Sequence, residues 1–115
     1  MTETQPVLVL TTVGSVHNAG KIANVLIEKR LAACVNVIDQ VRSFFRWEGS
    51  IGEDSEKLLL IKTMPERVDA LREHLIGIHP YDTPEFIVIE VREVWEKYGA
   101  WIVESCGDTT APKGG

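Results

Sequence analysis

One stretch of the chain, from Ala32 to Thr63, reads AACVNVIDQVRSFFRWEGSIGEDSEKLLLIKT and is rich in β-branched and aromatic residues. Only the polar segment 47–55 interrupts it, so the pattern predicts two long strands joined as a hairpin. Strands average roughly five or six residues, and these arms are about twice as long. Arms of that length reach beyond the core of a small domain, so their apolar ends need other copies of the chain to cover them. The hairpin therefore predicts an obligate oligomer.

The two arms of this hairpin carry different apolar patterns. In the first arm, the two-residue period of a strand predicts one shared face made of Ala33, Val35, Val37, Val41, Phe45 and Trp47. Asp39 and Ser43 interrupt that face, which favours a bend or bulge. The second arm is apolar on both faces over 58–61. We therefore expect helices on one side of the second arm and another subunit on the other.

The segments on either side of the hairpin supply the other elements. Val7–Val13 is an almost continuous apolar run, typical of a buried strand. Ser15 is the expected cap of an amphipathic helix that follows. Thr63 is the expected cap of a second helix, with Pro65 in its first turn. Residues 85–92 alternate like a strand, and an apolar stripe over 94–102 predicts a last helix.

This order predicts an α+β fold: a ferredoxin-like βαββαβ sandwich with an extra C-terminal helix and a long hairpin between the second and third strands. We expect one domain over 1–115, with an ordered core over about 7–106 and a flexible tail over 107–115. We expect the third strand to lie beside the first, and the fourth strand not to pair with the first. Part of the core would then lie between subunits, which predicts a thermostable protein.

Composition excludes several classes of partner. The net charge of −5 disfavours nucleic acid, which needs a basic surface. The chain has neither the pattern of a signal peptide nor the roughly 18 apolar residues in a row of a membrane helix. Cys34 and Cys106 lie far apart and outside any C-x-x-C pair, so we expect free thiols and a cytoplasmic location. No catalytic motif is evident, and the sequence does not indicate an enzyme.

The densest polar motif is IHPYDTPE, residues 78–85. Two prolines fix the backbone on either side of Tyr81 and Asp82, so the loop is expected to be rigid. The loop either presents these polar groups to a ligand or is only a turn that sets the direction of the last strand. His79 within it is a candidate metal ligand, because neutral imidazole commonly binds metals.

Two further residues stand at the ends of the hairpin strands. Lys62 is expected to reach solvent, to pair with a carboxylate such as Glu85, or to bind an anion beside the following helix. Trp47 marks the hairpin tip or a contact between subunits. If Lys62 and Glu85 meet, each charge stabilises the other.

Four motifs together resemble one known family, the CutA family of divalent-cation tolerance proteins. They are RLAACVNV at 30–37, WEGSI at 47–51, EKLLLIKT at 56–63 and HPYDTPE at 79–85. The resemblance runs from about Val7 to Cys106. It implies a ferredoxin-like fold and a homotrimer joined through long hairpins, similar to the PII signalling proteins, which are trimers with ligand sites between subunits.

The resemblance also implies a role in tolerance of copper and other divalent cations, with copper bound by some members. Those members carry a cysteine late in the first strand and a histidine pair before the Pro-Tyr dipeptide. This chain has Thr11 and the pair Ile78-His79 there, so His79 is the metal ligand that transfers. The chain lacks the soft thiolate that favours copper. No cofactor is expected to be required beyond copper or another divalent cation.

Two functional hypotheses follow. The first is a trimeric metal-responsive protein that uses His79 and nearby carboxylates. The second is a PII-like trimer that binds a small anion between subunits, in a pocket lined by Trp47, Lys62, Tyr81 and Glu85. A scaffold for a partner protein is a third possibility. We expect Lys62, Tyr81 and Glu85 to lie near one another, with Trp47 from the same or an adjacent subunit.

Overall fold

The computed structural model describes residues 5–107 and contains the predicted order of elements. The strands are β1 (Val7–Val13), β2 (Cys34–Trp47), β3 (Ser50–Thr63) and β4 (Ile87–Glu90). The helices are α1 (Val16–Glu28), α2 (Val68–Ile78) and α3 (Glu96–Ser105), with a 3₁₀ turn, η1 (Pro65–Arg67), before α2. Apart from Gly107, the predicted tail lies outside the described residues.

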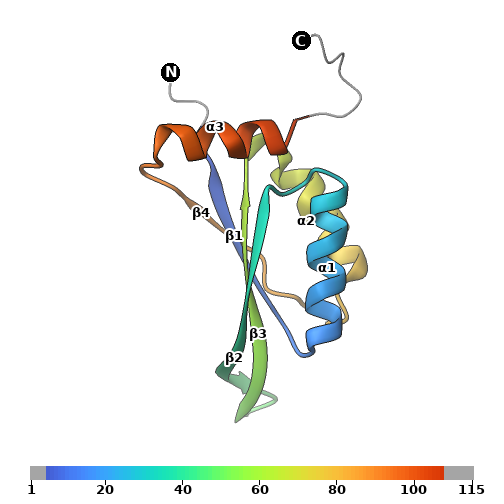
Figure 1. The fold of residues 1–115 in the computed structure, drawn as a ribbon. Helices are drawn as coiled ribbons and strands as arrows, with labels where there is room; N and C mark the ends of the chain where they lie inside the picture. The colour runs from blue at the N-terminus through green and yellow to red at the C-terminus, as the bar shows by residue number, and fades with distance from the viewer. Residues whose placement is uncertain (1–4, 108–115) are drawn as a thin grey trace.

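The four strands form one antiparallel sheet in the order β2-β3-β1-β4, and α1 and α2 cover one of its faces (Figure 1). This confirms the predicted ferredoxin-like α+β fold with its additional helix α3. In the described part of the chain, no helix is long and apolar enough to cross a membrane.

Strand β1 is central, because it pairs with both β3 and β4. Val7 lies opposite Thr63 on one side and opposite Glu90 on the other. The expectation that the fourth strand does not pair with the first was therefore wrong. After α2 the chain returns to the free edge of β1, as the second half of a ferredoxin-like fold requires. The loop over 79–86 spans this return and so runs past the end of β1.

The core lies between the sheet and the two helices. Its members are Val9, Val13, Ala19, Ile22, Leu26, Leu31, Ala32, Leu59, Ile61, Leu71 and Leu75. Ser15 caps α1 as predicted, because its side chain accepts a 3.1 Å hydrogen bond from the Asn18 N–H. Thr63 does not cap the second helix. Its buried hydroxyl donates to the Leu31 carbonyl at 2.7 Å and fastens the end of β3 to the core.

The outer halves of β2 and β3 project beyond the helices as a two-stranded arm (Figure 1). The molecule measures 54 × 27 × 21 Å, and its radius of gyration of 15.4 Å exceeds the ~13 Å of a compact chain of this length. Three large apolar side chains near the tip are mostly exposed: Phe44 at 61%, Trp47 at 64% and Ile51 at 74%. These three side chains at the tip of the arm are thus left largely uncovered by the rest of residues 5–107.

A β-bulge divides this arm. Ile38 pairs with Leu58 but Val41 pairs with Glu56, so β2 contains one extra residue between these two pairs. An extra residue shifts every later side chain of the strand to the other face. The predicted bulge is confirmed, but the single apolar face predicted for the first arm was wrong. Beyond the bulge, Phe45 and Trp47 lie on the sheet face opposite α1 and α2.

The face of the sheet opposite α1 and α2 is apolar and uncovered in the single chain. By strand register it carries Leu8, Leu10, Ile38, Leu58, Leu60, Ile87 and Ile89. Ile38, Ile87 and Ile89 are each more than two-fifths exposed. We call this surface the open face. Helix α3 crosses the sheet at the end far from the hairpin tip (Figure 1).

Candidate functional site

A cavity of about 700 Å³ lies between the arm and the loop that follows α2. It is lined by Thr12 of β1, Phe45 and Trp47 of β2, Gly52, Glu53, Asp54 and Glu56 of β3, and Tyr81, Asp82, Thr83 and Glu85 of the loop. We call it the acidic pocket. The bulge in β2 is what makes it possible, because the shifted register brings Phe45 and Trp47 to the same face as Glu56.

His79 fixes the start of the loop. Its Nδ1 accepts a 3.0 Å hydrogen bond from the Tyr81 backbone N–H, so its Nε2 carries the proton and donates to the Thr12 carbonyl at 2.8 Å. The side chain is 7% exposed, and its ring packs edge-on against Tyr81 at 4.7 Å between centroids. The imidazole is therefore neutral, and both of its nitrogens already have partners.

Tyr81 and Glu56 join the loop to the arm. The Tyr81 hydroxyl donates a 2.5 Å hydrogen bond to Oε2 of Glu56, whose side chain is buried. Burial raises the pKa of Tyr81, and the hydrogen bond to Glu56 and the negative charges of Glu56 and Asp54 raise it further. Gly14 lies beside this contact, since a Cβ there would sit 3.3 Å from the Tyr81 hydroxyl.

The residues that line the acidic pocket are strongly biased in charge. They comprise five carboxylates and no basic side chain. Only Glu53 forms an ion pair within the described residues, with Arg42 at 2.6 Å. The three aromatic residues of the lining are Phe45, Trp47 and Tyr81. A negative lining attracts cations and repels anions, and aromatic faces also attract cations.

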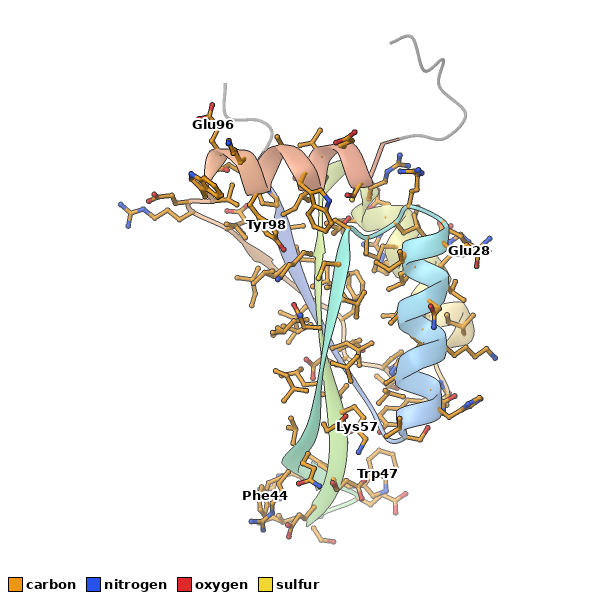
Figure 2. The ribbon with its side chains drawn as sticks, in the orientation of Figure 1. Glu28, Phe44, Trp47, Lys57, Glu96 and Tyr98 are labelled. Atoms are coloured by element: carbon orange, nitrogen blue, oxygen red, sulfur yellow. The ribbon has the colours of Figure 1, made fainter. Side chains whose placement is uncertain are left out.

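Of the four ligand-binding residues predicted from the sequence, the structure brings three together. Trp47, Tyr81 and Glu85 all line the acidic pocket. Lys62 does not join them in the single chain. It donates to the Tyr98 hydroxyl at 3.3 Å and lies 5.5 Å from the centre of that ring. Figure 2 shows Tyr98 on α3, at the opposite end of the molecule from Trp47.

Within one chain, the prediction that Lys62 lies near Glu85 was therefore wrong. The two residues belong to opposite ends of the sheet, because Lys62 lies near the end of β3 that pairs with the start of β1, whereas the loop passes the other end of β1. No ion pair joins them in the described residues.

Sequence reasoning missed Glu56, the most buried carboxylate of the acidic pocket. One feature of the sequence could have indicated Glu56. Glu56 has the same strand parity as Leu58 and Leu60, so it continues the apolar open face with a charge. A carboxylate in such a position is expected to be paired or to serve a site.

Preformed metal ligands are scarce. Within residues 5–107, no three or more His, Cys, Asp or Glu side chains are grouped so that they could hold a metal ion. His79 could bind a metal only after giving up one of its two hydrogen bonds. Thr11, at the position where the family resemblance implied a cysteine ligand, is fully buried and its hydroxyl has no partner among the described atoms.

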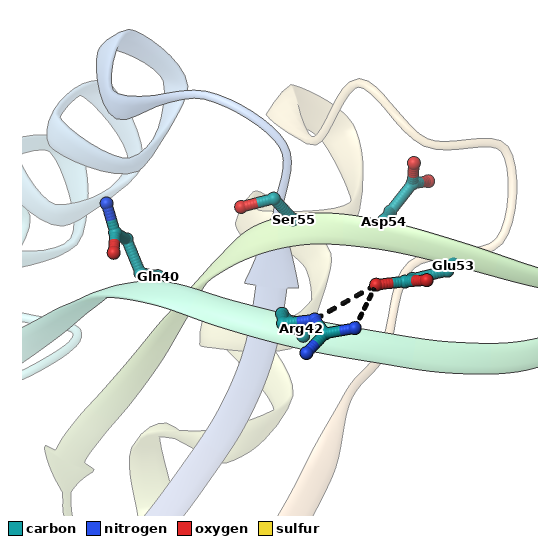
Figure 3. A pocket seen from close by; sticks show the side chains of 5 residues that line it. All are labelled: Gln40, Arg42, Glu53, Asp54 and Ser55. Carbon is teal, nitrogen blue, oxygen red and sulfur yellow. Dashed lines mark hydrogen bonds and ion pairs between the residues drawn. The ribbon is translucent and has the colours of Figure 1, made fainter.

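A second hollow, of about 450 Å³, lies on the arm and is lined by Gln40, Arg42, Glu53, Asp54 and Ser55. Figure 3 shows Arg42 bridging to Glu53 with two hydrogen bonds, at 2.6 and 2.9 Å. Both side chains are largely exposed, and an exposed ion pair contributes at most about 1 kcal/mol. The Arg42 guanidinium thus balances the charge of Glu53 in this hollow, whereas no basic side chain lines the acidic pocket.

The fold and the pocket define a ferredoxin-like α+β protein with an acidic site beside a projecting hairpin. Comparison with known proteins identifies the group more closely. The CutA1 divalent ion tolerance protein family matches residues 7–105. The divalent-cation tolerance protein CutA of Thermus thermophilus is 41% identical over 100 residues, which cover 87% of this chain and 97% of that protein. Human protein CutA is 43% identical over 94 residues, or 79% of this chain and 52% of the human protein.

Solved structures agree with this match. CutA1 of Thermus thermophilus superposes with a TM-score of 0.86 at 40% identity, covering 89% of this chain and 99% of that chain. CutA of Xylella fastidiosa superposes with a TM-score of 0.88 at 35% identity, covering 90% and 99%. The chain therefore belongs to the CutA1 divalent ion tolerance family.

Proposed function

We propose that this chain works as a homotrimer in the tolerance of divalent cations, and that the cations interact with the carboxylates of the acidic pocket. The observation that carries the proposal is the negative lining of that pocket, where four of the five carboxylates have no ion pair within the described residues, in a chain of the divalent ion tolerance family. A cluster of carboxylates raises the local concentration of small cations.

The trimer part of the proposal is supported by two apolar surfaces. The open face and the hairpin tip both expose large apolar side chains that a stable domain normally buries. Obligate interfaces are core-like in composition and often exceed ~2,000 Å². Sedimentation at micromolar concentration tests this part: we expect a single species of three chains, and a folded monomer would refute it.

The metal part of the proposal concerns the exposed rim of the pocket. Asp54 and Asp82 are exposed and Glu85 is half-buried, so their oxygens are accessible without unfolding. Carboxylate oxygens suit harder ions such as Mg²⁺ and Mn²⁺ better than copper. We therefore propose modest binding of several divalent cations, with His79 positioning the loop and joining copper only after local rearrangement.

Calorimetric titration with MgCl₂, MnCl₂ and CuCl₂ tests this assignment. The variants Asp82→Asn and Glu85→Gln should each weaken the binding of Mg²⁺ and Mn²⁺ severalfold. Glu73→Gln, at an exposed position of α2 outside the pocket lining, should not. Selective loss of copper binding in His79→Ala would make the imidazole a direct ligand. Absence of heat with all three metals would refute metal binding by the trimer.

A further inference from the structure

The acidic pocket holds one carboxylate whose charge no residue within 5–107 balances. Glu56 is 7% exposed and lines the cavity. Its Oε2 accepts from the neutral Tyr81 hydroxyl, but Oε1 has no hydrogen-bond donor and the carboxylate has no basic partner in residues 5–107. A buried carboxylate is normally paired with a cation. No described residue supplies that cation, so the carboxylate is available to a positively charged ligand.

The other carboxylates do not form one coordination shell within the described residues, so they would hold a divalent cation only loosely at the rim. A divalent ion needs several oxygens at about 2.0–2.6 Å from one point. The pocket's acidic residues come from both β3 and the loop, and no three of them are grouped to hold one ion in the described structure. They surround a space of about 700 Å³, which is far larger than an ion and its water.

The aromatic residues of the lining also bear on the kind of ligand. Phe45, Trp47 and Tyr81 provide aromatic surface within the same cavity as the carboxylates. Aromatic faces attract ammonium groups, and more strongly where the contact is shielded from water. They also cover the carbon chain of a ligand, which a hydrated metal ion lacks. Carboxylates spaced around aromatic walls are the combination that suits an organic cation.

We propose that the acidic pocket binds an aliphatic amine, with one ammonium group at Glu56, the carbon chain against Trp47 and Phe45, and a second ammonium at the rim near Asp82 and Glu85. This inference uses the pocket of the proposed function but concerns a different ligand. Amine and metal would compete at the rim, whereas only the amine would depend on Glu56 and Trp47.

Titration of the full chain with 1,4-diaminobutane tests the proposal, read by calorimetry and by tryptophan fluorescence in a Trp95→Phe, Trp101→Phe background that leaves Trp47 as the only emitter. Two probes of similar length serve as controls: uncharged 1,4-butanediol and dianionic succinate. The diamine should bind at least tenfold more tightly than either control, and its affinity should fall with added salt. Equal affinity for diamine and diol, or tighter binding of succinate, would overturn the proposal.

Variants locate the site. Glu56→Gln keeps an acceptor for Tyr81 and nearly the same shape, and it should weaken the diamine at least tenfold. Glu85→Gln, which leaves that buried contact intact, should weaken it severalfold, and Glu73→Gln should leave it unchanged. Diamine binding that survives both pocket variants would overturn the assignment.

The same variants separate this proposal from the metal proposal. If metal binds but diamine does not, and if Glu56→Gln leaves the metal affinity unchanged, the pocket is a metal rim only and the present inference fails. If diamine binds and metal does not, the proposed function fails while this inference stands. If the diamine binds only after Lys62→Met, a lysine of a second copy occupies the pocket, and the inference of a free ligand is overturned.

Discussion

The hydroxyl of Tyr81 donates a 2.5 Å hydrogen bond to Oε2 of Glu56 and thereby ties the loop after α2 to the arm formed by β2 and β3. The two residues are separated by 25 positions in sequence, and the contact closes one wall of the acidic pocket. It also provides the only hydrogen bond to the Glu56 carboxylate from the described residues. Loss of this contact should therefore affect both stability and the pocket.

Tyr81→Phe should lower the free energy of unfolding by about 1.5–3 kcal/mol, the range for hydrogen bonds to charged groups. The aromatic ring and its packing on His79 are retained, so the loss reports the hydroxyl alone. Urea unfolding at a fixed chain concentration measures it. The control is Thr83→Ala, at an exposed position of the same loop, which should change the free energy by less than about 0.5 kcal/mol. Equal stability of Tyr81→Phe and the parent chain would show that Glu56 does not need this donor.

The raised pKa of Tyr81 gives stability a dependence on alkaline pH. A tyrosine in the unfolded chain ionises near ~10, whereas the buried hydroxyl beside Glu56 keeps its proton to higher pH. Above pH ~10 the unfolded chain therefore binds fewer protons than the folded chain, so the free energy of unfolding falls as pH rises. In Tyr81→Phe this fall should be smaller.

Urea unfolding of the parent chain and Tyr81→Phe between pH 8 and pH 11 measures the difference. Burial also raises the pKa of the Cys106 thiol, but that contribution is present in both proteins and cancels in the comparison. The two free energies should converge as the pH rises. Parallel curves would mean that Tyr81 titrates alike in the folded and unfolded chains.

The sequence predicted the fold from residues whose periodicity is strong. The apolar run over 7–13, the cap at Ser15 and the long hairpin all lie where the pattern placed them. What it could not predict is the consequence of one extra residue in β2. A bend or bulge was expected from Asp39 and Ser43, but the change of face that it imposes on Phe45 and Trp47 depends on strand register, and register is a long-range property.

The candidate site was predictable only in part for a related reason. Trp47, Tyr81 and Glu85 were identified from local motifs, and the fold brings them to one pocket. Lys62 was assigned to the same site although β3 carries it to the far end of the sheet, where it contacts Tyr98. Short motifs indicate chemistry, but the distance between them is set by the length of the strands that separate them.

His79→Ala should destabilise the chain because the imidazole satisfies two backbone groups. The Thr12 carbonyl and the Tyr81 N–H would lose their partners, and buried groups left unpaired cost about 1–3 kcal/mol each. For two such groups we therefore expect a loss of about 2–6 kcal/mol in urea unfolding. The control is His74→Ala, at an exposed position of α2, which should change stability by less than about 0.5 kcal/mol. Similar small effects of both variants would mean that His79 is free for another role.

Leu60→Asp should prevent assembly and leave the core intact. Leu60 lies on the open face opposite Leu10 and Asn36, so an aspartate there points away from α1 and α2. In a trimer covered on that face, the charge would be buried without a partner, at a cost of several kcal/mol. Sedimentation should show smaller species than in the parent, and the melting temperature should fall and lose its dependence on chain concentration.

Leu59→Ala is the matched control, since Leu59 faces the helices and is fully buried. It should cost about 2–5 kcal/mol without changing the number of subunits. A Leu60→Asp chain that still forms a stable trimer would place the interface on another surface, such as the hairpin tip alone.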